Sequence, residues 1–332
     1  MPYRRLRTSR PPPLFELRVM ASLGRLAADQ SVALPPSRLM PRLRDYIESL
    51  LLANELPPTP HYIAMLIDDF LRLVALSQTG KPILYKKRNT LSLMFDVLAL
   101  QSEMRIDSPD ELVLGYTQSM MGFLLFNPEP KKIGMIGLGG GSLAKFCYRH
   151  LPNAAIAVAE IDPHVIAIRD QFHIPPDDER FQVHCMDGAD FIQQTENRFD
   201  VLMIDGFDRN GQPPQLCSER FYDDCHQALT QDGIVVVNLL GDAVETQVLV
   251  ERIDRAFNGA AVVIDALDAL NKIVFACKGS AMDLAGQVLM SRIGRLEALH
   301  PMILRLTAQS ILLQQRMKTL CAPPPAQENE SA

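Results

Sequence analysis

The chain has 332 residues, of which 47% are apolar and 22% are charged, and its formal net charge is −6. This length and apolar content are enough for one large domain or two ordinary ones, so we expect a globular protein. The acidic balance argues against a nucleic-acid carrier and is compatible with a cationic small molecule as substrate.

The six cysteines are scattered and include no C-x-x-C pair, which argues against a zinc site and against a disulfide framework. No apolar run approaches the ~20 residues that a membrane helix needs. We therefore expect a cytoplasmic protein that uses no metal and binds neither nucleic acid nor a membrane.

The N-terminal third of the sequence divides into three parts. Residues 1–30 are rich in Arg and Pro and predict a flexible arm. Residues 31–78 carry apolar side chains at helical spacing, interrupted by "PPTP", and predict a helical extension. Residues 79–108 contain two β-like runs around the turn-prone "RNT", which predict a short β region formed by a hairpin.

Residues 109–280 have the pattern of a Rossmann-like domain. Ser108, Pro109 and Glu111 combine an N-cap, a first-turn proline and a capping-box acid, and predict that a helix opens there. Continuous apolar runs then alternate with single helices, which indicates a parallel sheet covered on both faces. The runs "AVVIDAL" and "KIVFACK" predict a terminal hairpin of the same sheet.

The predicted fold class is therefore α/β, with a doubly wound sheet whose ligands bind at the carboxyl ends of the strands. Residues 281–320 return to helical spacing and predict C-terminal helices, and residues 321–332 predict a disordered tail.

The first strand of the domain ends in the glycine-rich stretch "IGLGGGSL". Gly137, Gly139, Gly140 and Gly141 allow a tight turn that comes close to a ligand, with Ser142 at the start of the following helix. An ordinary strand-to-helix turn is the alternative. No G-K-[ST] follows, which excludes a loop that grips phosphates with a lysine.

Carboxylates follow the next three strands. Glu160 is placed to accept the ribose hydroxyls of a nucleoside, although an acid at a strand end is often merely solvated. Asp187 can accept the adenine amine, cap the next helix, or do both. Asp205 faces the place where a reacting group would lie, and Asp208 follows in a Gly/Pro loop where acids often form turns.

The combination of a glycine turn with these acids favours adenosine bonded to a sulfonium over a nicotinamide dinucleotide. A pyrophosphate gains nothing from two further carboxylates, whereas a positive sulfur tolerates an acidic surround.

In these motifs the sequence resembles the spermidine synthase (polyamine aminopropyltransferase) family, a branch of the class I S-adenosylmethionine-dependent methyltransferase fold. The resemblance runs from about Leu84 to Lys278. It rests on "DELVLGYTQ", "IGLGGGSL", "AEIDPHVI", "MDGADF", "VLMIDGFDRNG" and "LCSERFYDDCHQALTQDGIVVVN".

The resemblance implies a reaction and a role for each site residue. An amine such as putrescine would attack the carbon next to the sulfonium of decarboxylated S-adenosylmethionine, with Asp205 accepting its proton. The amine would be bound by Asp208, Tyr116 and Gln101. The co-substrate would be bound by Gly137, Gly139, Gly140, Glu160, Asp187 and Gly188. The family commonly forms dimers, so a homodimer is one expectation.

One departure from the family pattern leaves the reaction open. The family carries an aspartate that grips the amine of the aminopropyl arm at the position of Gly140. Aminopropyl transfer is the first hypothesis. Methyl transfer from intact S-adenosylmethionine is the second, because a glycine would not repel that molecule's carboxylate, and a non-catalytic nucleoside-binding protein is the third.

Overall fold

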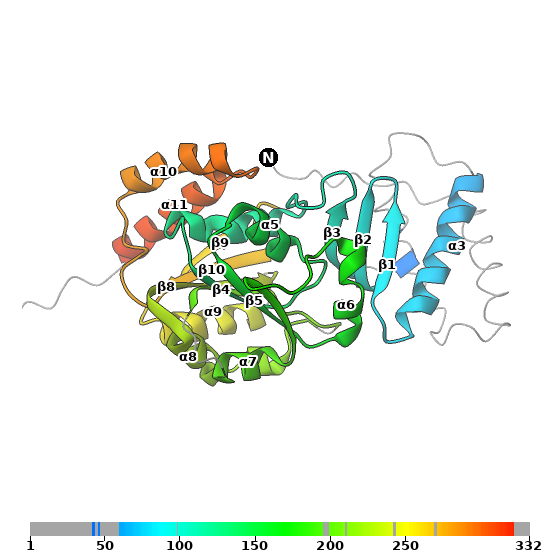
Figure 1. Ribbon diagram of the computed structural model, residues 1–332, viewed down its shortest axis with the longest axis horizontal. Helices are drawn as coiled ribbons and strands as arrows, with labels where there is room; N and C mark the ends of the chain where they lie inside the picture. Colours follow the sequence, from blue (N-terminus) through cyan, green and yellow to red (C-terminus); the bar gives the residue numbers. More distant parts are fainter. Residues whose placement is uncertain are drawn as a thin grey trace, which may run out of the picture. The chain divides into compact units, whose positions relative to one another are not determined.

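The structure is a computed structural model of the chain, shown in Figure 1. The residues that it describes are 42, 43, 46, 60–97, 99–194, 199–209, 211–241, 244–268 and 271–321. The predicted arm of residues 1–30 lies outside them. So does the predicted tail, except for Cys321, which ends the last helix. The described residues fall into two compact units, and each is described by itself.

The first unit contains helix α3 (Pro60–Ser77). The helix begins at the last residue of "PPTP", because a first-turn proline lacks an N–H that would be unpaired there anyway. The rings of Tyr46 and Phe70 lie 5.5 Å apart between centroids. Arg42 forms an ion pair with Asp96.

A three-stranded sheet of order β1-β2-β3 replaces the predicted hairpin. Its strands are β1 (Ile83–Lys87), β2 (Thr90–Asp96) and β3 (Ala99–Arg105). The second predicted run divides in two at Asp96, whose Oδ1 accepts the N–H of Val97 at 2.6 Å. A side chain that captures the next backbone N–H in this way removes a donor from the strand ladder, and the strand ends.

The helix predicted to open at Ser108 starts later than predicted, and this prediction was wrong. A hydrogen bond from the N–H of Glu111 to the Ser108 carbonyl closes a turn, but helix α4 (Gly115–Met120) begins at Gly115. Its N-terminus is capped from a distant part of the chain, where Asp268 Oδ2 accepts the N–H of Tyr116 at 2.9 Å. The tertiary cap decides the helix start over the local sequence signal.

The main sheet has seven strands in the order β6-β5-β4-β7-β8-β10-β9. The first five of these run parallel, and β10 is antiparallel to both β8 and β9. This confirms the predicted α/β sheet with its terminal hairpin. The strands are β4 (Lys132–Ile136), β5 (Ala155–Glu160), β6 (Phe181–Cys185), β7 (Phe199–Ile204), β8 (Leu229–Leu240), β9 (Val262–Asp265) and β10 (Asn271–Cys277).

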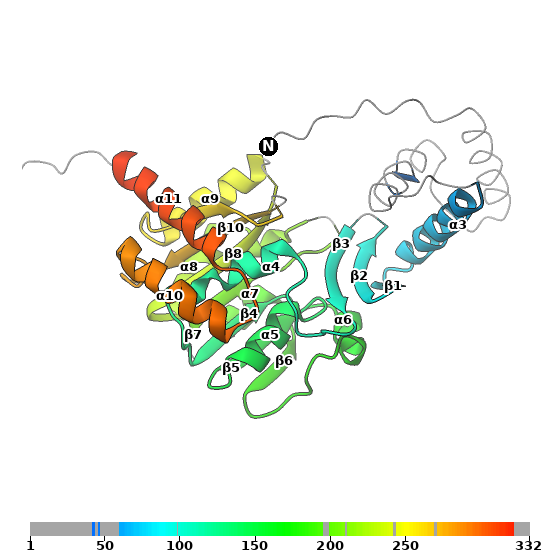
Figure 2. The same ribbon diagram turned by 90° about the horizontal axis from the view of Figure 1, so that it is seen from above.

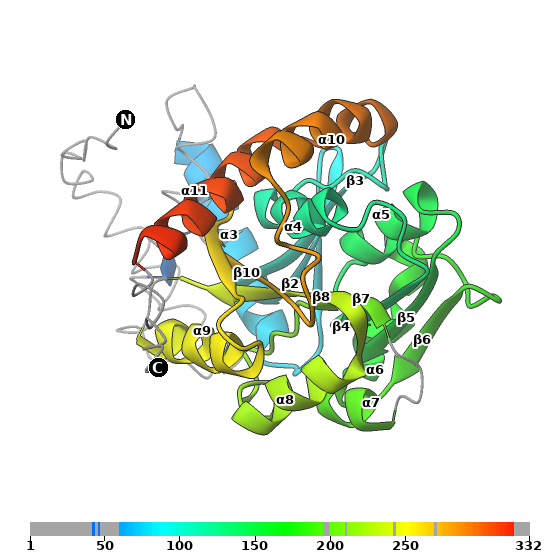
Figure 3. The ribbon, with the colours of Figure 1, turned by 90° about the vertical axis from the view of Figure 1, so that its left-hand side faces the viewer.

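Helices cover both faces of this sheet. Figure 3 shows α4, α5, α10 and α11 on one face and α7, α8 and α9 on the other, and Figure 2 shows α10 beside α11. Helix α9 is an addition to the predicted elements. The bounds are α5 (Ser142–His150), α6 (Pro163–Ala167), α7 (Gly188–Gln194), α8 (Glu219–Ala228), α9 (Val244–Ala256), α10 (Gly286–Leu299) and α11 (Arg305–Cys321), with 3-10 turns η1 (Met121–Leu125), η2 (Arg169–Phe172) and η3 (Pro214–Leu216).

The strand order reverses at β4, which has β5 on one side and β7 on the other. The carboxyl ends of β4 and β7 lie at one level, because Ile136 pairs with Ile204. The N–H of Asp205 then donates to the carbonyl of Ile136 at 2.9 Å. The glycine turn and Asp205 therefore emerge side by side, at the position where doubly wound folds bind ligands.

No helix among the described residues is both long enough and apolar enough to cross a membrane.

Candidate active site

The turn after β4 requires glycine at three positions. The φ angles of Gly137, Gly139 and Gly141 are +93°, +52° and +68°, a region that side chains with a Cβ rarely adopt. A Cβ on Gly137 would lie 2.3 Å from the carbonyl oxygen of Asp205. The glycines thus allow the turn after β4 to pack directly against the backbone that follows β7.

Glu160 ends β5 and supports this turn. Its Oε2 accepts the N–H of Leu138 at 2.9 Å, and its Oε1 accepts the N–H of Asp162 at 2.9 Å. The side chain is only 8% exposed, and this burial raises its pKa while the backbone donors oppose the rise. The backbone of Gly139 also hydrogen-bonds to this carboxylate, so Glu160 ties the glycine turn to the end of β5. Its predicted contact with a ribose stays a prediction.

Asp205 lies directly after β7 and is held from two sides. Its Oδ1 accepts Nδ2 of Asn238 at 2.7 Å, and its Oδ2 accepts the hydroxyl of Tyr116 at 3.1 Å. Burial raises the pKa of Asp205, and these two hydrogen bonds oppose the rise. Burial and the neighbouring carboxylate in turn raise the pKa of Tyr116, which keeps its hydroxyl a donor.

Asn238 is a site residue that the sequence analysis missed. It lies in β8 with 2% of its surface exposed, and its Oδ1 accepts Nδ2 of Asn271 at 2.8 Å. The two amides form a chain that fixes the direction of the donor to Asp205. The available signal was a single amide inside the apolar run "GIVVVNLL", since a buried polar group needs a partner.

The structure brings three of the predicted site residues together. The hydroxyl of Tyr116 contacts both Asp205 Oδ2 and, at 3.5 Å, the carbonyl oxygen of Gln101. The roles assigned to these residues by resemblance stay predictions.

Asp187 caps α7, which was one of its two predicted roles. Its Oδ1 accepts the N–H of Ala189 at 2.7 Å. Its Oδ2 accepts Nε2 of Gln215 at 2.9 Å, a contact that the sequence analysis did not foresee. A Cβ on Gly188 would lie 2.4 Å from Cγ2 of Ile136, so glycine there lets α7 pack against the end of β4.

Asp208 lies in an exposed turn of the loop after β7. Its N–H donates to the carbonyl of Gly211 at 2.8 Å, and the N–H of Gly211 donates back at 3.4 Å. This arrangement fits the turn-forming role that was the alternative for Asp208. Its predicted contact with a substrate amine stays a prediction.

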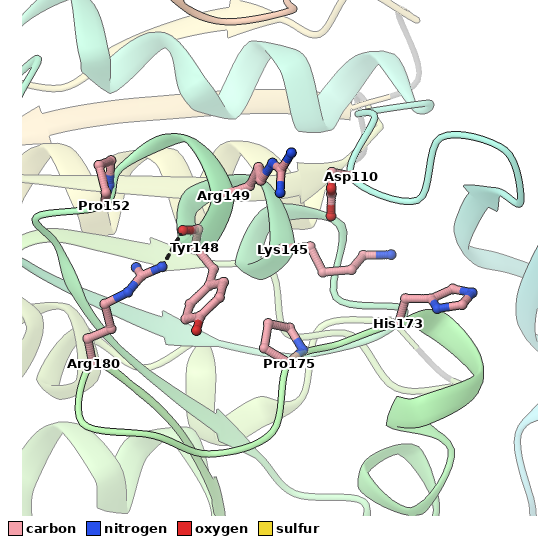
Figure 4. A pocket seen from close by; sticks show the side chains of 8 residues that line it. All are labelled: Asp110, Lys145, Tyr148, Arg149, Pro152, His173, Pro175 and Arg180. Carbon is pink, nitrogen blue, oxygen red and sulfur yellow. Dashed lines mark hydrogen bonds between the residues drawn. The ribbon is translucent and has the colours of Figure 1, made fainter.

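A pocket of about 430 Å³ borders the second half of α5 (Figure 4). None of the predicted site residues lines it. Lys145, Tyr148 and Arg149 enter it from α5, and the remaining side chains come from the preceding and following loops. The full lining is Asp110, Lys145, Tyr148, Arg149, Pro152, His173, Pro175 and Arg180.

Within the part of the chain that the structure describes, no group of three or more His, Cys, Asp and Glu side chains is placed to hold a metal ion.

Comparison with known proteins decides the family. The family model described as "Spermine/spermidine synthase domain" matches residues 114–269. The polyamine aminopropyltransferase of Chromobacterium violaceum is 36% identical over 210 residues, which make up 63% of this chain and 80% of that protein. The chain belongs to the spermine/spermidine synthase family.

Two solved structures show that this family member has the expected fold. A spermidine synthase in complex with the transition-state analogue AdoDATO aligns with a TM-score of 0.53 at 20% identity, covering 72% of this chain and 87% of that one. Human methyltransferase-like protein 13 in complex with SAH aligns with a TM-score of 0.50 at 22% identity, covering 65% and 97%. The main sheet is thus of the class I methyltransferase type.

Proposed function

We propose that this family member is a polyamine aminopropyltransferase, which moves an aminopropyl group from decarboxylated S-adenosylmethionine to a small aliphatic amine in the cytoplasm. The observation that carries the proposal is the Asp205 carboxylate, held by Tyr116 and Asn238 beside the glycine turn. Its relatives' printed name, polyamine aminopropyltransferase, supports the same reaction.

Such a reaction needs a base. An alkylammonium has a pKa near that of lysine, roughly 10, so it carries no free lone pair at neutral pH. A carboxylate whose pKa is raised by burial takes up a proton more readily than an exposed one. Each oxygen of Asp205 accepts one hydrogen bond from the protein and retains a lone pair for the ammonium.

The proposed step is an in-line displacement at carbon. Asp205 accepts a proton from the ammonium, and the freed nitrogen lone pair forms a bond to the carbon next to the sulfonium. The carbon–sulfur bond breaks, and its electron pair stays on sulfur, which leaves as the neutral thioether methylthioadenosine. Glu160 and the glycine turn hold the nucleoside, so the protein contributes orientation more than covalent chemistry.

The test is a transfer assay with decarboxylated S-adenosylmethionine and putrescine, or spermidine in its place. We expect release of methylthioadenosine and formation of the longer polyamine. In Asp205→Asn, kcat/KM should fall by at least ~10²-fold, the usual contribution of a general base, while the affinity for methylthioadenosine stays within about threefold. In asparagine the remaining oxygen can accept Nδ2 of Asn238, and the amide can donate to the hydroxyl oxygen of Tyr116, so the variant is expected to fold.

The matched control is Asp190→Asn, because Asp190 is an exposed acid in the first turn of α7. Its turnover should equal that of the parent protein. If Asp205→Asn turns over as fast as Asp190→Asn, then Asp205 is not the base. If the parent protein releases no methylthioadenosine with any amine, aminopropyl transfer itself is wrong.

Methyl transfer from intact S-adenosylmethionine is a second candidate, favoured by one observation. Gly140 offers no negative charge that would repel the carboxylate of the intact molecule. The same assay separates the two candidates by product, because methyl transfer releases S-adenosylhomocysteine and aminopropyl transfer releases methylthioadenosine.

A further inference from the structure

The glycine at position 140 is not required by its own backbone. Gly137, Gly139 and Gly141 have positive φ angles, but Gly140 is absent from the residues with positive φ. A residue with a Cβ could therefore adopt the conformation of Gly140. The reason for a glycine must lie in what surrounds it.

Ser102 of β3 supplies that reason. A Cβ on Gly140 would lie 2.6 Å from Oγ and 2.9 Å from Cβ of Ser102, and 3.0 Å from Cδ1 of Phe172. Ser102 is 5% exposed and Phe172 is fully buried, so neither side chain can easily swing away. The identities of residues 102 and 140 are thus coupled by space, because a side chain at one position excludes a side chain at the other.

Ser102 also joins the glycine turn to the reacting end of the site. Its Oγ lies 3.2 Å from Oγ of Ser142, the first residue of α5, and either hydroxyl can donate. The preceding residue, Gln101, has its carbonyl oxygen 3.5 Å from the hydroxyl of Tyr116, which in turn donates to Asp205. Two neutral hydroxyls therefore lie beside the glycine turn, and Ser102 directly follows the residue whose carbonyl oxygen contacts Tyr116.

We propose that Ser102 keeps the discrimination between the two co-substrates low: with Ser142 it forms an uncharged subsite for the tail on the sulfonium, and it excludes an acidic side chain from position 140. The inference rests on the proposed function and refines it. The protein then binds intact and decarboxylated S-adenosylmethionine with affinities within about tenfold of each other.

The chemistry of the hydroxyl group is the basis of this expectation. A hydroxyl donates to a carboxylate and accepts from an ammonium, so it satisfies either form of the tail. A carboxylate side chain at the same place would attract the ammonium and repel the tail's own carboxylate, which would separate the two affinities. Ser142 adds its position at the N-terminus of α5, where negative charge is tolerated.

The test measures by calorimetry the affinities of three ligands for the full chain: intact S-adenosylmethionine, its decarboxylated form, and methylthioadenosine, which lacks the tail. The variants are Ser102→Gly, Gly140→Asp, and Ser102→Gly combined with Gly140→Asp. We expect Gly140→Asp alone to lower the melting temperature, because its Cβ overlaps Ser102. The double variant should recover much of the loss, since only the contact with Phe172 then has to relax by a few tenths of an ångström.

We expect the double variant to favour the decarboxylated form at least tenfold more than the parent protein does, with unchanged affinity for methylthioadenosine. A parent protein that favours either form by more than about tenfold would overturn the inference, and so would a double variant with the parent's ratio. If the parent binds none of the three ligands, the proposed function fails and the inference falls with it. If the parent binds methylthioadenosine but strongly prefers one of the other two ligands, the inference is wrong and the proposed function still stands.

Discussion

Because of Lys145, we expect the free energy of unfolding to depend on pH. The side chain is 1% exposed, and its Nζ donates to the carbonyl oxygen of Phe172 at 2.8 Å. Burial lowers the pKa of Lys145 from the ordinary 10.5 to about 8, and the charge of Asp110 opposes this only in part. The amine borders the pocket of Figure 4, so it can exchange its proton with water.

The direction in which stability changes with pH follows from the number of protons bound by the folded and the unfolded chain. Below about pH 8 the amine is protonated in both the folded and the unfolded chain, and the fold bears the cost of a buried charge. Between about pH 8 and 10.5 the unfolded chain holds a proton that the folded chain has lost, so stability rises with pH. The two pKa values correspond to about 3 kcal/mol in total, of which about 2 kcal/mol is recovered between about pH 7.5 and pH 10.

The assay is urea unfolding of the parent protein and of Lys145→Met at both pH values. Methionine removes the titrating group, so the stability of the parent relative to the variant should rise by about 2 kcal/mol over this range. Taking the difference cancels other groups, such as the buried thiol of Cys147, whose raised pKa acts in the opposite direction. Lys131→Met, at an exposed lysine, serves as control for the loss of a lysine side chain.

A flat difference between the parent and Lys145→Met would refute this account of Lys145. It would mean that the amine stays as well solvated in the fold as in the unfolded chain. A difference that falls with pH would reverse the sign and mean that the charge of Asp110 outweighs the effect of burial on the pKa of Lys145.

Three further outcomes follow from the site. Gly137→Ala should lower the free energy of unfolding by about 3 kcal/mol in urea titration, since its Cβ meets the Asp205 carbonyl and its φ is positive; a loss under about 1 kcal/mol would contradict the close packing. Asn238→Ala removes a donor from Asp205, so its pKa rises and the acidic limb of the kcat/KM profile should move to higher pH; an unmoved limb would remove Asn238 from that role. Asp187→Ala should weaken methylthioadenosine binding in calorimetry by more than tenfold; separately, loss of the helix cap should lower the free energy of unfolding by about 1 kcal/mol. Unchanged affinity would exclude Asp187 from the nucleoside site.

Several features of the fold could be predicted from the sequence because they depend on residues that are neighbours along the chain. The alternation of apolar strands with helices predicts a parallel sheet, since each run must bury its own apolar face. The glycine turn and the acids at the strand ends then fall on one edge of that sheet by topology alone. For this reason the position of Asp205 beside the glycine turn could be predicted without knowledge of any contact.

Where the sequence misled, a distant residue outweighed a local signal. The capping signature at Ser108 gives only a turn, because Asp268 caps the helix further on. The apolar run after "RNT" breaks at Asp96, where a side chain takes a backbone donor. A buried donor or acceptor is satisfied by whichever partner packing brings near, and spacing along the chain does not encode that partner.

The sequence by itself determined the fold class, the edge of the sheet where the glycine turn and the strand-end acids lie, and so the position of the candidate site. Only the tertiary structure decided how these residues are held: Asn238 comes from β8 and Tyr116 from α4 to orient Asp205, and Ser102 comes from β3 to fill the space beside Gly140. Local periodicity fixes which face each element buries. The orientation of a carboxylate and the space beside a glycine depend on elements that meet only after the sheet has assembled.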